Sequence, residues 1–347
     1  MAATIKDVAR AAGVSPATVS RVLSNQKAFY SEKTAQKVRA AVKQLGYRRN
    51  TSAVELVTQR SKVIAVLVSS TQTNFSDQIL KGIQEQARVH NLSVMIIFAG
   101  EGDAEVQAKA IRTVIERSVM GILLVAIDLD PSNDELLENA NIPFIFISMT
   151  LKNSAFPFIS SNDFDIGYQA TKYLIGKGHQ KIGLAATDLD SFVGHLRYEG
   201  YRDAMRDNHL SFDEDWICGG HFTYEDGVNA MEHYGPQTEL TAVISSSDLA
   251  GIGILNQATN YGMKVPDRLA ILTIDGTQLC DIVRPKLSSV TQSFFEMGAN
   301  GMDMLVSDSF KEFYSMYTPI KMTSFGLNYP VLPNPFSRWG LTEWICW

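Results

Sequence analysis

The sequence is poor in cysteine, and it contains no long apolar run. Its 347 residues include three cysteines, Cys218, Cys280 and Cys346, which are far apart and fit neither a metal-binding spacing nor a framework of disulfides. No stretch of about 18 uncharged apolar residues occurs, so no membrane span is expected. Charged residues interrupt the first ten positions, which argues against a signal peptide. Together these absences favour a cytoplasmic protein.

The sequence also lacks the short motifs of common enzyme classes. It has no glycine-rich phosphate-binding loop, no nucleophile elbow, and no His and Glu pair at metal-ligand spacing. The six histidines are scattered, and only His195 lies near another candidate residue, two positions before Arg197. We therefore expect no catalytic residues, no metal and no cofactor. The length is too great for one ordinary core, so two or three domains are expected.

Two short helices with a tight turn between them are predicted within Ile5–Leu23. Thr4 can cap the first helix, and an aspartate three residues later completes a capping box. Gly13 suits the turn, Ser15 can cap the second helix, and Pro16 fits its first position. This is the layout of a helix-turn-helix, whose second helix enters the DNA major groove. A helical hairpin with no DNA-binding role is the alternative.

Three runs in this segment are more informative than the spacing alone. They are Asp7-Val8-Ala9, Ala12-Gly13-Val14-Ser15 and Thr18-Val19-Ser20-Arg21. Together they resemble the DNA-binding signature of the lactose and galactose repressor (LacI/GalR) family. One departure is Ser24, where the family usually has Asn. The resemblance implies a set of DNA-binding residues: Thr4, Ser15, Pro16, Ala17, Thr18, Ser20, Arg21, Asn25, Tyr47 and Leu56.

Within this set, Ala17 and Arg21 are expected to face base edges, and Arg21 is the best candidate to pair with guanine. The charge of the chain supports this interpretation. Residues 1–62 hold 12 Lys and Arg and 3 Asp and Glu, a net charge of +9, whereas the whole chain carries −6 and the remainder therefore −15. A basic module joined to an acidic body is expected of a phosphate-binding headpiece on a sensor. For any single Lys or Arg, the simpler interpretation is a solvent-exposed side chain on a helix face with no role in DNA binding.

A third helix and a linker complete the N-terminal part. The third helix is predicted over Ser31–Leu45, and Tyr47 is expected to pack on it. Thr51–Gln59 is predicted as a short hinge helix, marginal alone. In the resembled family this hinge folds on the operator, and a leucine matching Leu56 wedges into the minor groove. Alternatively, Leu56 anchors the linker to the body. The family often has Arg where this chain has Val54, which weakens phosphate attraction there.

From residue 63 onwards, short apolar runs alternate with amphipathic stretches. This alternation predicts parallel sheets with helices on both faces. The first half is predicted to hold strands Val63–Val68, Val94–Phe98, Gly121–Val125 and Pro143–Ile147, with helices Phe75–His90, Ala104–Arg117 and Asn133–Asn139. The pattern restarts with helices Ile166–Lys177, Gly194–Asn208, Tyr224–His233, Leu249–Tyr261 and Phe294–Val306, and strands Lys181–Ala186, Ala242–Ser246, Leu269–Ile274 and Pro319–Met322. Two such halves imply a cleft, with ligands outside the carboxyl ends of the strands.

Loop motifs of this body resemble the sensor core of the same family, which has the periplasmic sugar-binding-protein fold. They are Gly178-His179, Arg197-Tyr198-Glu199-Gly200-Tyr201, Ser247-Asp248-Leu249-Ala250, and Arg284-Pro285 followed by Leu287-Ser288-Ser289-Val290. The predicted fold class is thus α/β, an all-α helix-turn-helix headpiece followed by a two-subdomain core. The expected divisions are a headpiece at 1–49, a hinge at 50–62, a core at 63–322 (63–162 with 290–322, and 163–289) and an atypical tail at 323–347.

The resemblance also implies an effector site. Its candidates are Asn74, Phe75, Asp163, Arg197, Asp248 and Asp275, and Phe192 or Phe222 are further rings that could stack on a sugar. By motif position, Arg197 and Asp248 are expected to clamp sugar hydroxyls, because a guanidinium donates and a carboxylate accepts pairs of hydrogen bonds. For Asp163 and Asp248, helix capping is the alternative.

The resulting prediction is a repressor of a sugar-utilisation operon that acts as a homodimer, or as a tetramer built from it. It binds a pseudo-palindromic stretch of double-stranded operator DNA, as two-fold symmetry requires. A small sugar, such as ribose, controls it allosterically. A purine or a phosphocarrier protein is the alternative effector. A sugar-binding transport protein is a weaker alternative, since it needs an export signal and no basic headpiece.

Overall fold

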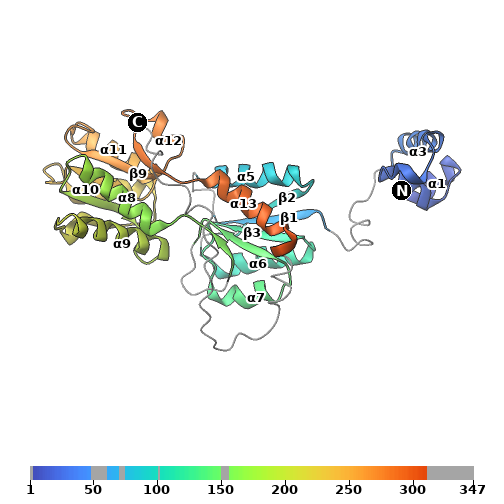
Figure 1. The fold of residues 1–347 in the computed structure, drawn as a ribbon, viewed down its shortest axis with the longest axis horizontal. Helices are drawn as coiled ribbons and strands as arrows, with labels where there is room; N and C mark the ends of the chain where they lie inside the picture. The colour runs from blue at the N-terminus through green and yellow to red at the C-terminus, as the bar shows by residue number, and fades with distance from the viewer. Residues whose placement is uncertain (1–2, 48–60, 70–74, 101, 150–155, 311–347) are drawn as a thin grey trace. The chain divides into compact units, whose positions relative to one another are not determined.

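The computed structural model describes residues 3–47, 61–69, 75–100, 102–149 and 156–310 (Figure 1). The chain divides into two compact units, residues 1–61 and 62–347. The predicted hinge helix with Leu56, the candidate Asn74, the strand Pro319–Met322 and the C-terminal tail lie outside the described residues, so they stay predictions. None of the described helices combines the length and the apolar composition that a membrane span requires.

Over residues 3–47, the N-terminal unit holds three α-helices around a small apolar core. They are α1 (Ile5–Ala12), α2 (Pro16–Leu23) and α3 (Glu32–Gln44), with a 3-10 turn η1 (Lys27–Phe29) before α3. Gly13 turns the chain between α1 and α2 at φ 65°, a left-handed conformation that favours glycine. The side chains packed between the helices are Val8, Ala9, Ala12, Val19, Val22, Ala35, Val38 and Ala41. The helices predicted within Ile5–Leu23 and over Ser31–Leu45 are confirmed.

The first lobe of the second unit is built on a parallel sheet in the order β2-β1-β3-β4-β5. Its strands are β1 (Val63–Val68), β2 (Ser93–Phe98), β3 (Gly121–Val125), β4 (Phe144–Ile147) and β5 (Phe158–Ile159). Its helices are α5 (Ser76–Val89), α6 (Ala104–Glu116), α7 (Asp134–Glu138) and α13 (Phe294–Val306), with a 3-10 turn η2 (Pro131–Asn133). In Figure 1, α5 and α13 lie side by side over one face of the sheet and α6 covers the other.

Successive residues of β1 show why this sheet has two covered faces. Ile64, Val66 and Val68 are buried with residues of α5 and α13, whereas Ala65 and Leu67 are buried with residues of α6. Side chains along a strand alternate between the faces of its sheet. An uninterrupted apolar strand therefore has to be covered twice, as in parallel sheets generally.

The second lobe repeats this plan with a sheet in the order β10-β9-β8-β6-β7. Its strands are β6 (Ile182–Thr187), β7 (Ile217–Gly219), β8 (Ala242–Ser245), β9 (Ala270–Asp275) and β10 (Ser288–Thr291). Its helices are α8 (Asp163–Gly176), α9 (Phe192–Asp207), α10 (Tyr224–Tyr234), α11 (Asp248–Asn260) and α12 (Leu279–Ile282), with a 3-10 turn η3 (Glu214–Trp216). All the pairings within both sheets are parallel. The predicted α/β fold class is confirmed.

After β10 the chain returns to the first lobe, where α13 packs against α5. Three short strands, β5, β7 and β10, and the four-residue helix α12 were not among the predicted elements. They hold only two to four residues each, too few for a periodic apolar pattern to develop. Helix α8 begins at Asp163, three residues before its predicted start, because the Asn162 side chain caps it.

Candidate functional site

Helix α2 presents the predicted base-reading residues on its outer side. The Ser15 hydroxyl accepts a hydrogen bond from the Thr18 amide at 3.1 Å and so caps the helix. Val19 and Val22 point into the core, which leaves Pro16, Ala17 and Arg21 exposed near its start and outer face. The structure therefore brings these three candidates together on one accessible surface. A helix exposed in this way can lie in a major groove with its N-terminal residues against the bases.

Several other predicted DNA-binding residues use their side chains within the N-terminal unit. The Thr4 hydroxyl donates to Asp7 Oδ2 at 2.6 Å, in addition to the two bonds of the capping box between these residues, and the hydroxyls of Ser15 and Thr18 lie 2.9 Å apart. Asn25 adopts φ 54° and its Oδ1 accepts from the Tyr30 hydroxyl at 3.4 Å. These contacts fix the helices and the turn after α2. Contacts of the same residues with DNA stay predictions, as they do for half-buried Ser20 and Tyr47.

In the second lobe, close packing of α8 against α9 places Arg197 beside Asp163. A Cβ at Gly167 would lie 2.1 Å from the Arg197 carbonyl oxygen, and a Cβ at Gly200 would lie 2.0 Å from the Phe164 carbonyl oxygen. Both distances are shorter than atoms can approach, so only glycine permits this contact. Gly200 belongs to the motif Arg197-Tyr198-Glu199-Gly200-Tyr201, and the absent side chains of both glycines let the two helices meet.

Arg197 is buried, with 6% of its surface exposed, and three groups hold its guanidinium. Its Nε donates to Asp163 Oδ1 at 2.9 Å, and its NH1 donates to the Ser246 carbonyl at 2.9 Å. The guanidinium carbon also lies 5.8 Å from the centre of the Phe222 ring. Burial raises the pKa of Asp163, and the Arg197 charge acts in the opposite direction. The structure thus brings together two predicted effector residues and Phe222, one of the two further rings predicted from the sequence.

Asp275 ends strand β9 close to this pair. Burial, and then the negative charge of Asp248, raise the pKa of Asp275 to about 8, although Arg197 and Gln292 act to lower it. The Gln292 side-chain amide donates to Asp275 Oδ1 at 3.0 Å. Near pH 7 the Asp275 carboxyl is therefore largely protonated, so it can donate one hydrogen bond as well as accept.

Asp248, which is predicted to clamp a ligand, uses its carboxylate for hydrogen bonds within the protein. Its Oδ1 accepts from the hydroxyls of Thr273 at 2.5 Å and Ser289 at 3.1 Å, and its Oδ2 accepts from the Thr277 amide at 2.6 Å. Only 1% of the residue is exposed. The carboxylate therefore ties α11 to β9, β10 and the loop after β9. The side chain that caps α11 is that of Ser247, so the Asp248 carboxylate does not cap this helix.

The sequence reasoning missed Thr273, Ser289 and Gln292, which hold the two aspartates in place. A signal for the first was present, since Thr273 and Asp275 are polar residues on a strand whose other members are apolar. Phe75, the described first-lobe candidate, stacks on Phe294 of α13, with ring centres 4.6 Å apart and planes inclined by 16°. Its ring packs against the first-lobe core. His195 is exposed.

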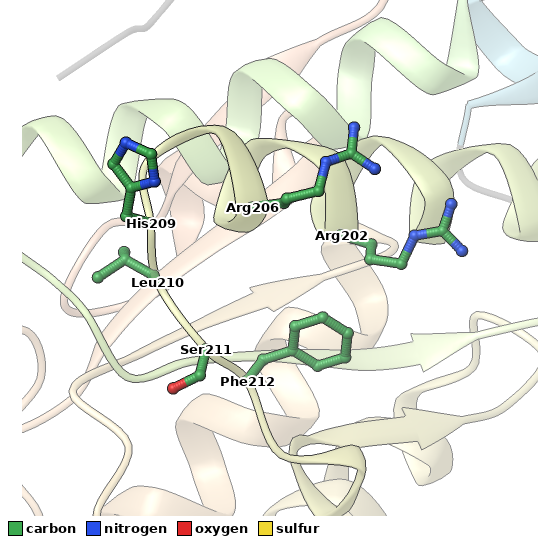
Figure 2. Close-up of a pocket in the computed structure, with 6 residues that line it drawn as sticks. All are labelled: Arg202, Arg206, His209, Leu210, Ser211 and Phe212. Carbon is green, nitrogen blue, oxygen red and sulfur yellow. The ribbon is translucent and has the colours of Figure 1, made fainter.

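Elsewhere in the second lobe, an open hollow of about 460 Å³ lies at the C-terminal end of α9 (Figure 2). It is lined by Arg202, Arg206, His209, Leu210, Ser211 and Phe212. Arg202 lies 2.7 Å from Glu199, and Arg206 lies 3.0 Å from Asp203, so nearby carboxylates offset both guanidinium charges. None of the predicted effector residues lines this hollow, so it is not the predicted effector site. No group of three or more potential metal ligands occurs in the described ranges.

Comparisons with known proteins identify the family of the chain. Residues 4–50 match the family described as "Bacterial regulatory proteins, lacI family", and residues 61–295 match "Periplasmic binding proteins and sugar binding domain of LacI family". The transcriptional repressor PurR of Vibrio campbellii is 31% identical over 306 residues, which cover 88% of this chain and 91% of that protein. The chain therefore belongs to the LacI family, and it is a DNA-binding transcriptional repressor with a ligand-binding core.

Solved structures give the same result for the fold. A transcription regulator from Lactobacillus plantarum shares 42% identity at a TM-score of 0.68, over 72% of this chain and 92% of that one. The lac repressor dimer, bound to operator and the anti-inducer ONPF, shares 27% identity at a TM-score of 0.79, over 88% of this chain and 92% of that one. PurR and the lac repressor are repressors by name, which supports the expectation of a regulator rather than an enzyme.

Proposed function

We propose that this repressor controls a sugar-utilisation operon in the cytoplasm, and that a small sugar bound in the second unit alters its affinity for the operator. Two copies, paired as in the lac repressor dimer, would each present α2 to one half of a pseudo-palindromic site. The observation that carries the effector assignment is the buried Arg197, Asp163 and Asp275 cluster at the carboxyl ends of the second-lobe strands. Ligands of parallel α/β sheets bind at such ends.

The cluster suits vicinal hydroxyl groups. The Arg197 guanidinium has five N–H donors and uses two of them within the protein, one on Nε and one on NH1. A protonated Asp275 supplies one donor and further acceptors, which matches hydroxyls that both donate and accept. The Phe222 ring, next to the guanidinium, offers an apolar face for the C–H side of a sugar. In this assignment Asp248 is a positioning residue, because its three internal hydrogen bonds order the loop that follows Asp275.

The first lobe supplies the opposite side of the proposed ligand site. Asp128 follows β3, and its pKa is raised by burial first and then by the charge of Asp188, which follows β6. The carboxyl ends of the two sheets therefore lie within electrostatic reach of each other. A ligand that contacts both ends would favour one arrangement of the two lobes. It would raise operator affinity if the operator-bound dimer has that arrangement, and lower it if the operator-bound dimer has another.

The test is thermal unfolding of the full chain against separate panels of sugars, purines and sugar phosphates. A ligand present at 100 times its Kd stabilises the folded state by about 2.7 kcal/mol. We expect a sugar to raise the unfolding temperature of the wild type and of Arg202→Ala, a control on the same helix, but not of Arg197→Lys. Stabilisation by a purine instead would establish the alternative effector. A panel with no stabilising ligand would contradict the small-molecule proposal and favour the phosphocarrier protein.

A further inference from the structure

An exposed phenylalanine lies directly beside the predicted base-reading arginine. Phe29 ends the η1 turn with 62% of its surface exposed, and the Arg21 guanidinium carbon lies 5.2 Å from the centre of its ring. This separation is within the range of a cation–π contact. Because the Phe29 ring is mostly exposed, replacing it with a smaller side chain would cost little burial free energy. Core packing therefore does not explain a phenylalanine at this position.

The other described arginines of the N-terminal unit are placed differently. Arg10 lies 3.8 Å from Asp7, and Arg39 lies 3.4 Å from Glu32. A carboxylate meets a guanidinium at its edge, where the N–H donors are, and partly neutralises it. A ring instead meets the guanidinium at its face and leaves the donors in its plane available. Among the three arginines described over residues 3–47, Arg21 is therefore the one without a carboxylate at its edge, which suits the paired acceptors O6 and N7 of guanine.

The backbone fixes the ring and the guanidinium relative to each other. The Gln26 amide donates to the Arg21 carbonyl at 3.0 Å, and the Phe29 amide donates to the Gln26 carbonyl at 3.0 Å. The next residue, Tyr30, packs against the apolar core of this unit and bonds to Asn25 through its hydroxyl. The turn that carries Phe29 is thus tied to the end of α2, which carries Arg21. Two backbone hydrogen bonds and the half-buried Tyr30 set the spacing between these two segments of the backbone.

We propose that Phe29 is a positioning residue for DNA reading. Its ring holds the Arg21 guanidinium by one face, so that the donor edge meets guanine already oriented when α2 enters the major groove. This rests on the proposed role of Arg21 in base reading. Pre-ordering a long side chain reduces the entropy lost on binding. The effect therefore belongs to specific binding and depends on Arg21.

The experiment uses the full chain and an operator selected from random duplex DNA with the wild-type protein. Dissociation constants are measured for wild type, Phe29→Leu, Phe29→Tyr, Arg21→Ala and the double variant Arg21→Ala/Phe29→Leu. Each protein is also tested on duplexes in which single guanines are replaced by 7-deazaguanine, which lacks the N7 acceptor. Phe158→Leu, an exposed phenylalanine on β5, is the control, and circular dichroism verifies that each variant is folded.

We expect Phe29→Leu to weaken operator binding about three- to fivefold, the size of an exposed cation–π contact. One 7-deazaguanine duplex should be bound equally by wild type and Arg21→Ala, and on that duplex Phe29→Leu should cause no further loss. Phe29→Leu should also cause no loss in the Arg21→Ala background. Phe29→Tyr should bind the operator like wild type. An equal loss in the Arg21→Ala background would overturn the proposal, because Phe29 would then act without Arg21. So would an unchanged affinity of Phe29→Leu. If Arg21→Ala itself leaves specific binding intact, the base-reading role of Arg21 fails instead.

Discussion

The N-terminal unit and the second lobe each present an arginine to a proposed ligand, and they hold it by different means. Arg21 is exposed and lies over one ring, whereas Arg197 is buried and bonded to a carboxylate and a carbonyl. An exposed guanidinium remains hydrated and pays no desolvation penalty in the free protein, and it can still attract a polyanion such as DNA. A buried charge needs fixed partners, which also orient it for a small ligand. Burial thus distinguishes the two recognition surfaces.

The largest expected effect concerns the buried arginine. Arg197→Ala leaves Asp163 buried without its partner, which should lower the free energy of unfolding by about 3–5 kcal/mol. Urea titration measures the change. Asp163→Asn in the same background should recover part of the loss, and Arg202→Ala should change stability by no more than about 0.5 kcal/mol. A small loss for Arg197→Ala would show that the pair is solvated, contrary to the comparison above.

A pH-dependent effect is expected at Asp275, whose pKa is raised to about 8 from an ordinary value of 3.8. Between these values the unfolded chain loses the proton and the folded chain keeps it, so rising pH favours unfolding. This contribution should reach about 1 kcal/mol per pH unit between pH 5 and 7. Asp275→Asn removes it, so the variant should gain stability relative to wild type as the pH rises. A constant difference across that range would be inconsistent with a raised pKa.

The contact between α8 and α9 gives a third prediction. Gly200→Ala would place a Cβ 2.0 Å from the Phe164 carbonyl oxygen and force the helices apart. We expect a loss of about 1–3 kcal/mol in the free energy of unfolding, as for other overpacked sites, together with weaker effector binding. Gly176→Ala, on α8 with nothing within 4 Å of the added Cβ, is the matched control. Similar behaviour of both variants would contradict the role given to Gly200.

The smallest expected effect is at the start of α2. The Ser15 side chain caps this helix by accepting from the Thr18 amide. Ser15→Ala should therefore destabilise the N-terminal unit by about 1 kcal/mol, visible as lower helix content and weaker DNA binding at elevated temperature. Ser15→Asp, which also caps helices well, should restore the stability. Equal losses for the two variants would mean that the hydroxyl acts on DNA and not as a cap.

Much of the fold follows from local sequence patterns, but the site depends on long-range contacts. The β1, β3 and α13 boundaries agree with the predicted ranges, because uninterrupted apolar runs and helical periodicity are local signals. Arg197 and Asp163 were both predicted as candidates, yet their pairing across 34 residues depends on how α8 meets α9. The direction of the Asp248 carboxylate depends on Thr273 and Ser289, which are distant in the sequence, so the motif alone does not determine it.

The central claim is that Arg197 reports a bound ligand to the DNA-binding surface that carries Arg21. The most direct test measures operator affinity of wild type and Arg197→Lys, with and without the sugar that stabilises the wild type. The account predicts a ligand-dependent change in wild-type affinity, of about 5- to 150-fold for a typical allosteric coupling. It predicts no such change in Arg197→Lys, whose affinity without ligand should match that of wild type. The same ligand response in both proteins would contradict it.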